Sequence, residues 1–319
     1  MKRDLVSFSS FSGAEINELF SICTWLLSPE GKSYKPLAGK TAAMIFEKQS
    51  LRTRVSFEVG VIQLGGAAMF LSQQNIGVST REPVRDIAEV LSRYNDMIIA
   101  RTMLHSTVEQ LAEFSTVPVI NALTDLLHPC QILADAYTLL QRNMLTPKHK
   151  IVFVGDGNNV ANSWLELAEK IPLHFVLACP KGYEADASIL NRAMAAKKSR
   201  IEITNDIREA ASGASALYTD VWVSMGQEEE AAKRREAFAS YQINAELLKL
   251  AAPDCVVMHC LPAHRGEEIT AEVLEGPHSV VLDEAENRLH MQKAVMGFLL
   301  RESGVRERKD ISIGNLVEA

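Results

Sequence analysis

Short apolar runs alternate with longer amphipathic runs along nearly the whole chain. Such alternation predicts βαβ units, in which mainly parallel strands are covered by helices on both faces, and therefore an α/β fold. The expected strands are Ala42–Phe46, Ala67–Leu71, Asp96–Ala100, Val117–Asn121, Lys150–Val154, His174–Ala178, Arg200–Ile203, Ala216–Thr219, Cys255–His259 and Val280–Leu282. The expected helices include Arg54–Leu64, Val84–Tyr94, Pro129–Leu140, Val160–Lys170 and Glu284–Arg301.

The length of 319 residues suits two domains of roughly 150 residues each. Turn-forming and polar residues interrupt the pattern over Gln141–Lys150, and the next strand begins a new βα series. We therefore predict a first domain over residues 1–142 and a second over residues 150–283. We assign the C-terminal segment 284–319 to the first domain, and we expect the polar tail after Ser303 to be loosely held.

The composition is that of an ordinary globular protein. A formal net charge of -7 disfavours binding to nucleic acid or to an anionic membrane surface. The five cysteines are odd in number and form no C-x-x-C pair, which argues against a disulfide framework or a zinc ribbon. The amino terminus lacks the apolar run of a signal peptide, and no uncharged apolar stretch approaches the roughly 18 residues of a membrane span. We expect a reducing, cytoplasmic setting.

The stretch Ser50-Leu51-Arg52-Thr53-Arg54 lies where an expected strand ends and a helix begins. Backbone N–H groups at a helix start carry partial positive charge, and the hydroxyls of Ser50 and Thr53 add donors. Arg52 and Arg54 add guanidinium groups suited to phosphate oxygens. We interpret the stretch as a phosphate site. The alternative is a serine N-cap followed by surface arginines.

Two further groups of polar residues follow expected strands. Arg101 comes directly after the apolar run Met97–Ala100, where a lone arginine is more often a solvated surface residue. The segment His128–Gln131 opens a helix with proline at the favoured first-turn position. On their own, its histidine and glutamine would be read as structural.

The loop Gly155–Asn159 follows a buried strand and precedes a helix. It is not G-x-G-x-x-G, so a nicotinamide site is weakly supported. Gly155 and Gly157 allow a tight turn, and the asparagines can cap the helix, bind a ligand or do both. Further along, Asp220 follows the strand Ala216–Thr219 and offers a carboxylate suited to an ammonium group. The alternative for this segment is a turn with a buried tryptophan.

The tetrapeptide His259-Cys260-Leu261-Pro262 ends another expected strand. A cysteine beside a histidine suggests a nucleophile. Adjacent strand residues point to opposite faces, however, so we expect no His259–Cys260 dyad. No C-x-x-C or histidine pair supports a metal ion. Arg288, in the last expected helix, would by itself be an ordinary helix charge.

Four of these motifs resemble, in the expected order, signatures of the aspartate and ornithine carbamoyltransferase family. They are Ser50–Arg54 (Ser-x-Arg-Thr-Arg), His128–Gln131 (His-Pro-x-Gln), Asp220–Gly226 (Asp-x-x-x-Ser-Met-Gly) and His259–Pro262 (His-Cys-Leu-Pro). The segment Phe46–Gly60 resembles the ornithine branch, and the resemblance extends to about Met296. It implies two parallel α/β domains with the active site in the interdomain cleft. It also implies a homotrimer, or a multiple of trimers, with sites shared between subunits.

The resemblance further implies a role for each matching residue. Carbamoyl phosphate would be bound by Ser50, Leu51, Arg52, Thr53, Asn75, Arg101, His128, Pro129, Cys130, Gln131, Cys260, Leu261 and Arg288. Ornithine would be bound by Asn159, Asp220, Ser224 and Met225, and catalysis would use Arg54, Arg101, His128, Asp220 and Cys260. The implied reaction transfers the carbamoyl group to the δ-amine of ornithine without a cofactor. Its products are citrulline and phosphate, as in arginine biosynthesis.

Two segments are implied to act through movement or a neighbouring subunit. The polar loop Gln73–Gly77 resembles one whose glutamine reaches a neighbour's site. Asn75 stands at that place but is one methylene shorter, and Gln74 is the alternative. The charged run Gln227–Ala237 resembles a mobile loop that closes over ornithine, and is otherwise a solvated helix.

Several alternative functions remain at this stage. Putrescine lacks the α-carboxylate, and an N-acylated ornithine masks the α-amine that Asp220 would bind, so free ornithine is favoured. Aspartate would call for more cations near the second substrate. Outside this class, the alternatives are a non-catalytic binding protein that has kept the pocket and, more distantly, a nicotinamide oxidoreductase.

Overall fold

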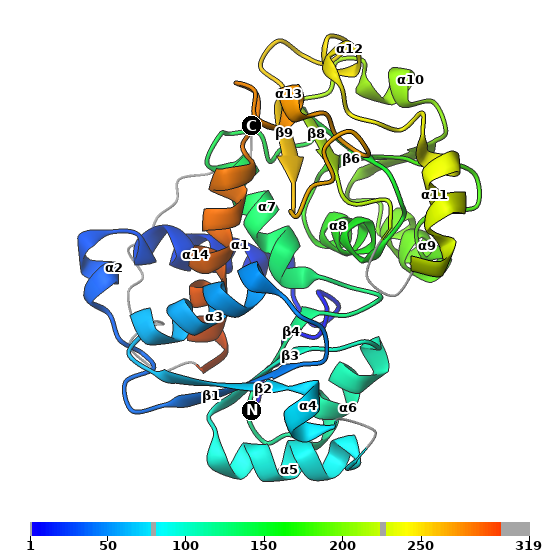
Figure 1. The fold of residues 1–319 in the computed structure, drawn as a ribbon. Coiled ribbons are helices and arrows are strands. Elements are labelled where there is room, and N and C mark those ends of the chain that lie inside the picture. The colour runs from blue at the N-terminus through cyan, green and yellow to red at the C-terminus, as the bar shows by residue number, and fades with distance from the viewer. Residues whose placement is uncertain (1, 78–80, 224–227, 301–319) are drawn as a thin grey trace. The chain divides into compact units, whose positions relative to one another are not determined.

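The computed structural model describes residues 2–77, 81–223 and 228–300, without the side chains of Asn75 and Glu228. The chain divides into two compact units. Unit 1 comprises residues 1–133 and 288–319, and unit 2 comprises residues 134–287. The divisions fall within the helices α7 (Pro129–Leu140) and α14 (Val281–Leu300). Figure 1 colours the chain from its amino to its carboxyl end and labels both helices.

Unit 1 is built on a four-stranded parallel sheet in the order β2-β1-β3-β4. Its strands are β1 (Thr41–Phe46), β2 (Ala67–Ser72), β3 (Met97–Arg101) and β4 (Val119–Leu123). Each predicted strand in this half of the chain is confirmed to within two residues at either end. In the register of β1 with β3, Phe46 lies opposite Arg101, so the two strands end at the same edge of the sheet.

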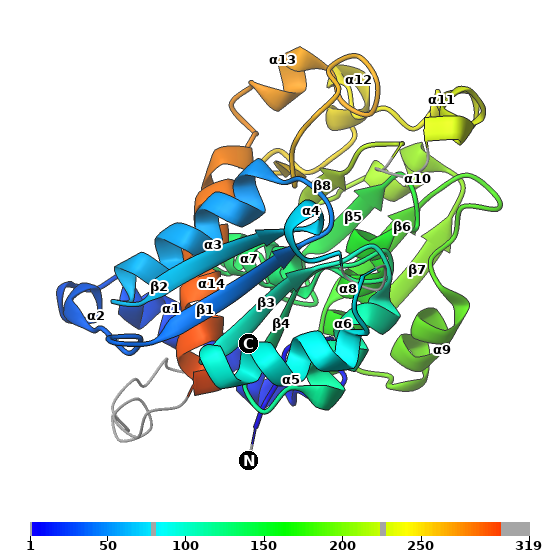
Figure 2. The same cartoon turned by 60° about the horizontal axis from the view of Figure 1, so that its bottom comes forward.

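Helices cover both faces of this sheet. They are α1 (Gly13–Leu26), α2 (Pro29–Ser33), α3 (Leu51–Gln63), α4 (Gln73–Ile76), α5 (Val84–Tyr94) and α6 (His105–Phe114). Figures 1 and 2 place α5 and α6 on one face, and α1, α3 and the C-terminal part of α14 on the other. Gly60 lets α3 approach α14 closely, because a Cβ atom there would lie 3.0 Å from the Met296 methyl group.

Unit 2 is built on a five-stranded parallel sheet in the order β7-β6-β5-β8-β9. Its strands are β5 (Lys150–Val154), β6 (His174–Ala178), β7 (Arg200–Thr204), β8 (Ala216–Thr219) and β9 (Val256–His259). The helices are α8 (Asn159–Lys170), α9 (Ala187–Ala195), α10 (Ile207–Ala211), α11 (Ala231–Phe238), α12 (Ala245–Leu248) and α13 (Ala271–Leu274), with a 3-10 turn, η1 (Glu228–Glu230). The prediction of an α/β fold with two parallel sheets flanked by helices is confirmed.

Two local predictions are wrong. The segment Val280–Leu282 is not a strand, because α14 begins at Val281 and Glu284 N–H donates to the Val280 carbonyl to close its first turn. Three apolar residues fit either element, and the acidic first turn of α14 suits a helix start. The polar stretch Gln73–Gly77 is not wholly a loop, because residues 73–76 form the helical turn α4, which ends at Gly77 with φ 59°.

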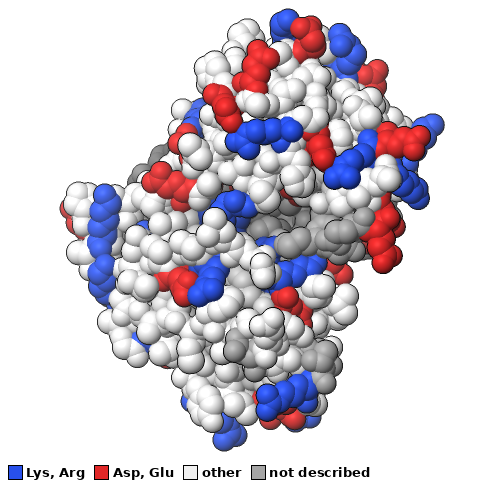
Figure 3. Space-filling view, viewed as in Figure 1, with Lys and Arg blue, Asp and Glu red and all other residues white. Residues whose placement is uncertain are grey.

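On the face drawn in Figure 3, Lys and Arg side chains are interspersed with Asp and Glu side chains rather than gathered into a broad patch of one sign. None of the described helices is long and apolar enough to span a membrane. All five cysteines lie in the described part of the chain and carry thiols rather than disulfides. The polar tail after Ser303 lies outside the described residues.

Candidate active site

The first group of site residues surrounds the start of α3, directly after β1. The Ser50 hydroxyl accepts from the Thr53 N–H group at 3.2 Å, so the serine is the N-cap of this helix. The Arg54 guanidinium lies 3.7 Å from the centre of the Phe70 ring and donates to Glu58 at 3.2 Å. Leu51, in the same first turn, is 73% exposed. The capping interpretation is therefore correct, and it leaves the positive end of the helix available to an anion.

Two arginines from distant parts of the chain converge on one hydroxyl in unit 1. Arg101 at the end of β3 donates to the Thr53 Oγ1 atom at 3.4 Å, and Arg288 from α14 donates to it at 2.9 Å. All three side chains are buried. Within the described residues, Arg288 donates only to neutral oxygens and has no carboxylate partner. Two buried guanidinium groups on a neutral oxygen form a site in which an anion would be strongly stabilised.

The start of α7 adds amide and imidazole groups to the same cluster. Arg288 donates to the Gln131 Oε1 atom, and the fully buried His128 lies within the field of both arginines. Burial first, and then the charges of Arg288 and Arg101, lower the pKa of His128 well below its usual value. His128 is therefore a neutral imidazole at neutral pH, able to donate one hydrogen bond without adding charge.

Cys130, which follows Pro129 in the first turn of α7, has a structural environment. Its thiol is directed at the Asn121 carbonyl oxygen, 3.4 Å away. Burial raises the pKa of this thiol to about 12, so it stays protonated. The predicted contact of Cys130 with carbamoyl phosphate could therefore come from its backbone but not from a thiolate.

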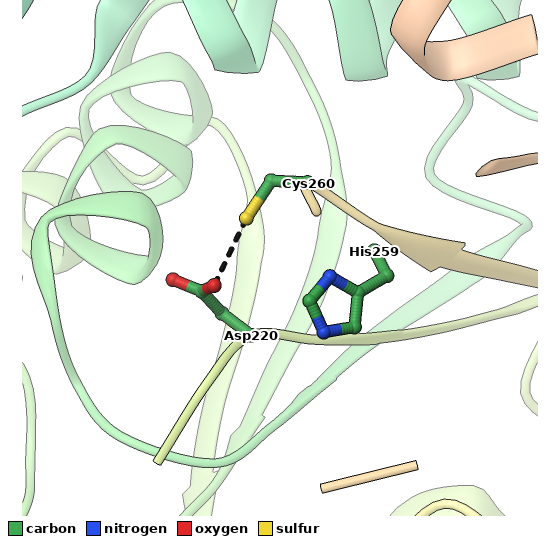
Figure 4. A group of neighbouring side chains, drawn as sticks. All are labelled: Asp220, His259 and Cys260. Carbon is green, nitrogen blue, oxygen red and sulfur yellow. Dashed lines mark hydrogen bonds between the residues drawn. The ribbon is translucent and has the colours of Figure 1, made fainter. Parts of the chain in front are cut away.

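In unit 2, the parallel register brings two predicted residues together. Thr219 of β8 pairs with His259 of β9, so the next residues, Asp220 and Cys260, leave the sheet side by side. The Cys260 thiol donates to the Asp220 Oδ1 atom at 3.0 Å, as Figure 4 shows. Burial first, and then the Asp220 charge, raise the pKa of Cys260 well above its usual value. Cys260 is therefore a hydrogen-bond donor and not a nucleophile.

Asp220 is held by two further donors. Its Oδ1 atom accepts from the Val221 N–H group at 2.8 Å, and its Oδ2 atom accepts from the Asn158 Nδ2 atom at 2.8 Å. Asn158 is the N-cap of α8, because its Oδ1 atom accepts from the first-turn N–H groups of Val160 and Ala161. The capping prediction for this loop is confirmed, although its link to Asp220 was not foreseen. Asn159, the residue predicted to bind the amino acid, is the first residue of α8.

The glycine at position 157 shapes this loop. A Cβ atom there would lie 2.3 Å from the backbone of Glu184 and Ala185, so no other residue fits without moving the chain. Gly155, at the end of β5, has φ 142°, which also favours glycine. The two glycines therefore bring the loop close to the neighbouring backbone and carry Asn158 to the edge of the sheet beside Asp220.

His259 and Cys260 form no dyad, which agrees with the prediction from the strand pattern. Its Nδ1 atom accepts from the Leu261 N–H group at 2.8 Å, so its Nε2 atom carries the proton and donates to Glu268 at 3.1 Å. Asp220, His259 and Cys260 lie close enough to suggest a metal site. Both ring nitrogens of His259 are engaged, however, and Figure 4 shows the sulfur directed at Asp220. Leu261 itself turns the chain with φ 55°.

Some predicted residues lie outside the described part of the chain, and one important residue was missed by sequence reasoning. Ser224, Met225 and Gln227 lie outside the described residues, as does the side chain of Asn75. The neighbouring Gln74 is exposed.

The rest of the charged run Gln227–Ala237 is not simply a solvated helix, because Arg234 of α11 is 6% exposed. It donates to the Asp156 carboxylate at 2.9 Å and to the Trp222 carbonyl at 3.0 Å. Nothing distinguishes this arginine from its charged neighbours in the sequence.

Two family models match the chain. Residues 3–141 match the family model "Aspartate/ornithine carbamoyltransferase, carbamoyl-P binding domain". Residues 148–299 match the model "Aspartate/ornithine carbamoyltransferase, Asp/Orn binding domain".

Curated relatives and solved structures give the same result. The ornithine carbamoyltransferase of Chlorobaculum tepidum is 54% identical, over 96% of this chain and 92% of that protein. That of Syntrophus aciditrophicus is 50% identical, over 94% of this chain and all of that protein. The solved ornithine carbamoyltransferase of Pyrococcus furiosus is 46% identical with a TM-score of 0.86, covering 93% of this chain and 96% of that one. The chain therefore belongs to the aspartate/ornithine carbamoyltransferase family.

Proposed function

We infer that this enzyme transfers the carbamoyl group of carbamoyl phosphate to the δ-amine of L-ornithine, giving L-citrulline and phosphate. The observation that carries the inference is the pairing of two unlike half-sites in one chain. Unit 1 holds buried guanidinium groups around a helix start, and unit 2 holds a carboxylate fastened by three hydrogen-bond donors. The relatives that cover nearly the whole chain carry the name of this activity.

The carbamoyl phosphate half of the proposal lies in unit 1. Arg52, Arg54 and the N–H groups at the start of α3 would hold the phosphate, with Ser50 and Leu51 in the same turn. Thr53, Arg101 and His128 would donate to the carbamoyl oxygen, where negative charge develops during attack. A neutral His128 suits this role, because it supplies an N–H group beside two existing positive charges. Gln131 and Arg288 would orient the carbamoyl amide and complete the pocket.

The ornithine half of the proposal lies in unit 2. Asp220 would pair with the α-ammonium group, and Asn159, Ser224 and Met225 would contact the rest of the amino acid. The Cys260 and Leu261 backbone would face the amines near the carbamoyl group. The side-chain hydrogen bonds leave Asp220 unable to rotate freely, so the position of its charge is set before the substrate binds.

The reaction needs no cofactor in this proposal. The neutral δ-amine attacks the carbamoyl carbon, the C–O bond to phosphate breaks, and the amine nitrogen loses a proton. Because an amine with a Lys-like pKa of about 10.4 is mostly protonated near neutral pH, activity should rise with pH as the free amine appears. A rate that stays flat between mildly acid and alkaline pH, at saturating substrates, would count against this mechanism.

Three finer statements belong to the same proposal. The carbamoyl phosphate domain spans residues 1–142 with 284–319 and the ornithine domain residues 150–283, although residues 134–142 and 284–287 belong to compact unit 2. The enzyme assembles as a homotrimer or a multiple of trimers, with Asn75 or Gln74 reaching a neighbouring site. It serves arginine biosynthesis in the cytoplasm.

The proposal is tested with purified protein and four acceptors. Carbamoyl phosphate is supplied with ornithine, putrescine, N-acetylornithine or aspartate, and the ureido product is measured. Citrulline from ornithine alone is the expected result. Product with another amine only would refute the assignment of Asp220 to the α-ammonium group. Binding of both substrates without product would refute catalysis and favour a binding protein.

A further inference from the structure

Two carboxyl groups lie hydrogen-bonded to each other inside unit 2, away from solvent. Asp135 belongs to α7 and Glu284 to the first turn of α14, and each has 0% of its surface exposed. Neither residue appears among the site residues predicted from the sequence. Burying two ionised carboxylates costs free energy unless they are neutralised or well hydrogen-bonded. A proton or hydrogen-bond donors must therefore compensate for the burial of this pair.

The hydrogen bond between them requires a shared proton. Two ionised carboxylates are acceptors only, so one member of the pair must be protonated to donate. The Tyr218 hydroxyl donates to the Asp135 Oδ2 atom at 2.8 Å and also stabilises negative charge on Glu284, so it serves whichever member of the pair is ionised. Burial first, and then the Asp135 charge, raise the pKa of Glu284 well above its usual value. We therefore place the shared proton on Glu284 and the single negative charge on Asp135.

The pair is joined to the chain that carries the ornithine-binding residues. The Glu284 Oε2 atom accepts from the His259 N–H group at 3.0 Å, at the last residue of β9. Cys260 follows His259 directly and donates to Asp220. Tyr218, which Asp135 accepts from, lies on β8 two residues before Asp220. The pair therefore holds the ends of both strands from which Asp220 and Cys260 emerge.

We propose that Asp135 and Glu284 are positioning residues for the amino-acid half of the reaction, acting as a carboxyl–carboxylate pair that shares one proton. They hold the ends of β8 and β9, and so set the place of the Asp220 carboxylate relative to the substrate amine. This assignment rests on the function proposed above, because Asp220 is its target. Cys260 and Tyr218 are the other titratable groups that interact with the pair, and Asp220 lies beyond Cys260, from whose thiol it accepts.

The shared proton makes a specific prediction about amide variants. In Glu284→Gln, the new amide donates to the Asp135 carboxylate, and its oxygen accepts from His259. In Asp135→Asn, the new amide donates to a now ionised Glu284, and its oxygen accepts from Tyr218. Each variant keeps both hydrogen bonds and the single negative charge. Glu284→Ala keeps the charge on Asp135 but neither hydrogen bond of Glu284, because it removes the donor to Asp135 and leaves the His259 N–H group without its acceptor.

The kinetic test compares these variants with wild type and with Glu272→Gln, which makes the same change at an exposed position on α13. Both amide variants should keep kcat/KM for ornithine within about threefold of wild type. Glu284→Ala should lose at least about tenfold, the effect of one buried polar group left unpaired, with the KM for carbamoyl phosphate unchanged. Equal losses in the amide and alanine variants, or losses shared between the two substrates, would overturn the positioning role.

A spectroscopic test follows the proton itself and does not depend on activity. At mildly alkaline pH, the infrared spectrum of folded wild type should contain the carbonyl stretch of a protonated carboxyl group. That band should disappear in both Glu284→Gln and Asp135→Asn and persist in Glu272→Gln. Absence of the band from wild type, or its survival in both amide variants, would overturn the shared proton. Because this readout needs no turnover, its failure is distinguishable from a failure of the proposed function.

Discussion

Exchanging the hydrogen-bonding roles of Asp220 and Asn158 separates the chemical role of the carboxylate from its structural one. In Asp220→Asn, the new Nδ2 group faces a donor in either orientation, because the Nδ2 group of Asn158 lies 2.8 Å from one original acceptor atom and the Val221 N–H group lies 2.8 Å from the other. Asn158 cannot turn over to relieve this, because its Oδ1 atom accepts from two N–H groups at the start of α8. The single substitution therefore removes a charge and also places two donors against each other.

The size of each effect follows from the contacts. A hydrogen bond to a charged group contributes about 1.5–3 kcal/mol, so loss of the contact with the substrate ammonium should lower kcat/KM for ornithine about 10- to 150-fold. The facing donors should separately destabilise unit 2 by about 1–3 kcal/mol, measured as a lowered thermal unfolding temperature.

The double variant Asp220→Asn with Asn158→Asp restores the structural part alone. Aspartate caps a helix as well as asparagine does, and its second oxygen can accept from the new amide at position 220. Thermal stability should therefore return towards wild type. The kcat/KM for ornithine should stay low, because the charge now lies on the wrong residue. Recovery of both quantities together would refute the idea that the Asp220 carboxylate binds the substrate.

Three further predictions concern other groups. The pKa of Glu284 is raised in the folded protein, so folding takes up a proton when the pH is above 4.5, the ordinary pKa of this group. As the pH rises from there to the raised pKa, the free energy of unfolding should fall by up to about 1.4 kcal/mol per pH unit. That contribution should be absent from denaturant titrations of Glu284→Gln. Cys260 should resist alkylation in native protein and react faster in Asp220→Asn, because the charge that helps to raise the pKa of its thiol is gone. Arg288→Met should raise the KM for carbamoyl phosphate at least about tenfold with little change in that for ornithine, since it removes a charged donor from unit 1 alone.

The two sheets and their strand ends could be predicted because they depend on local patterns. A run such as Lys150–Val154 is apolar, short and followed by glycine, which leaves few alternatives to a buried strand. Once the strands are parallel, residues that follow them gather at one edge, so Asp220 was accessible to sequence reasoning. Arg101 by itself was more often expected to be a solvated surface residue, and only the family resemblance pointed to the buried side chain that the structure shows. The error at Val280–Leu282 shows the limit of this reasoning, because three apolar residues have no measurable period.

The polar contacts that hold the site were not predictable in the same way. Asn158 is recognisable as a helix cap, but its bond to Asp220 depends on the order of β5 and β8 in the sheet. Arg234 stands in a run of charges of which the others mostly face solvent. Which charge is buried is decided by distant residues such as Asp156, and no spacing within the run records that choice.

The buried carboxyl pair extends this argument to protonation. In a sequence, Asp135 and Glu284 each read as ordinary helix acids, and each alone would be expected to ionise at neutral pH. Their protonation differs from this expectation because α7 and α14 bring the two buried side chains together beside Tyr218. A proton thereby becomes a structural component of the enzyme, bridging two carboxyl groups that would otherwise repel each other. Because an amide at either position supplies the donor and leaves one negative charge on the other member, the two amide variants should distinguish a shared proton from two independent acids.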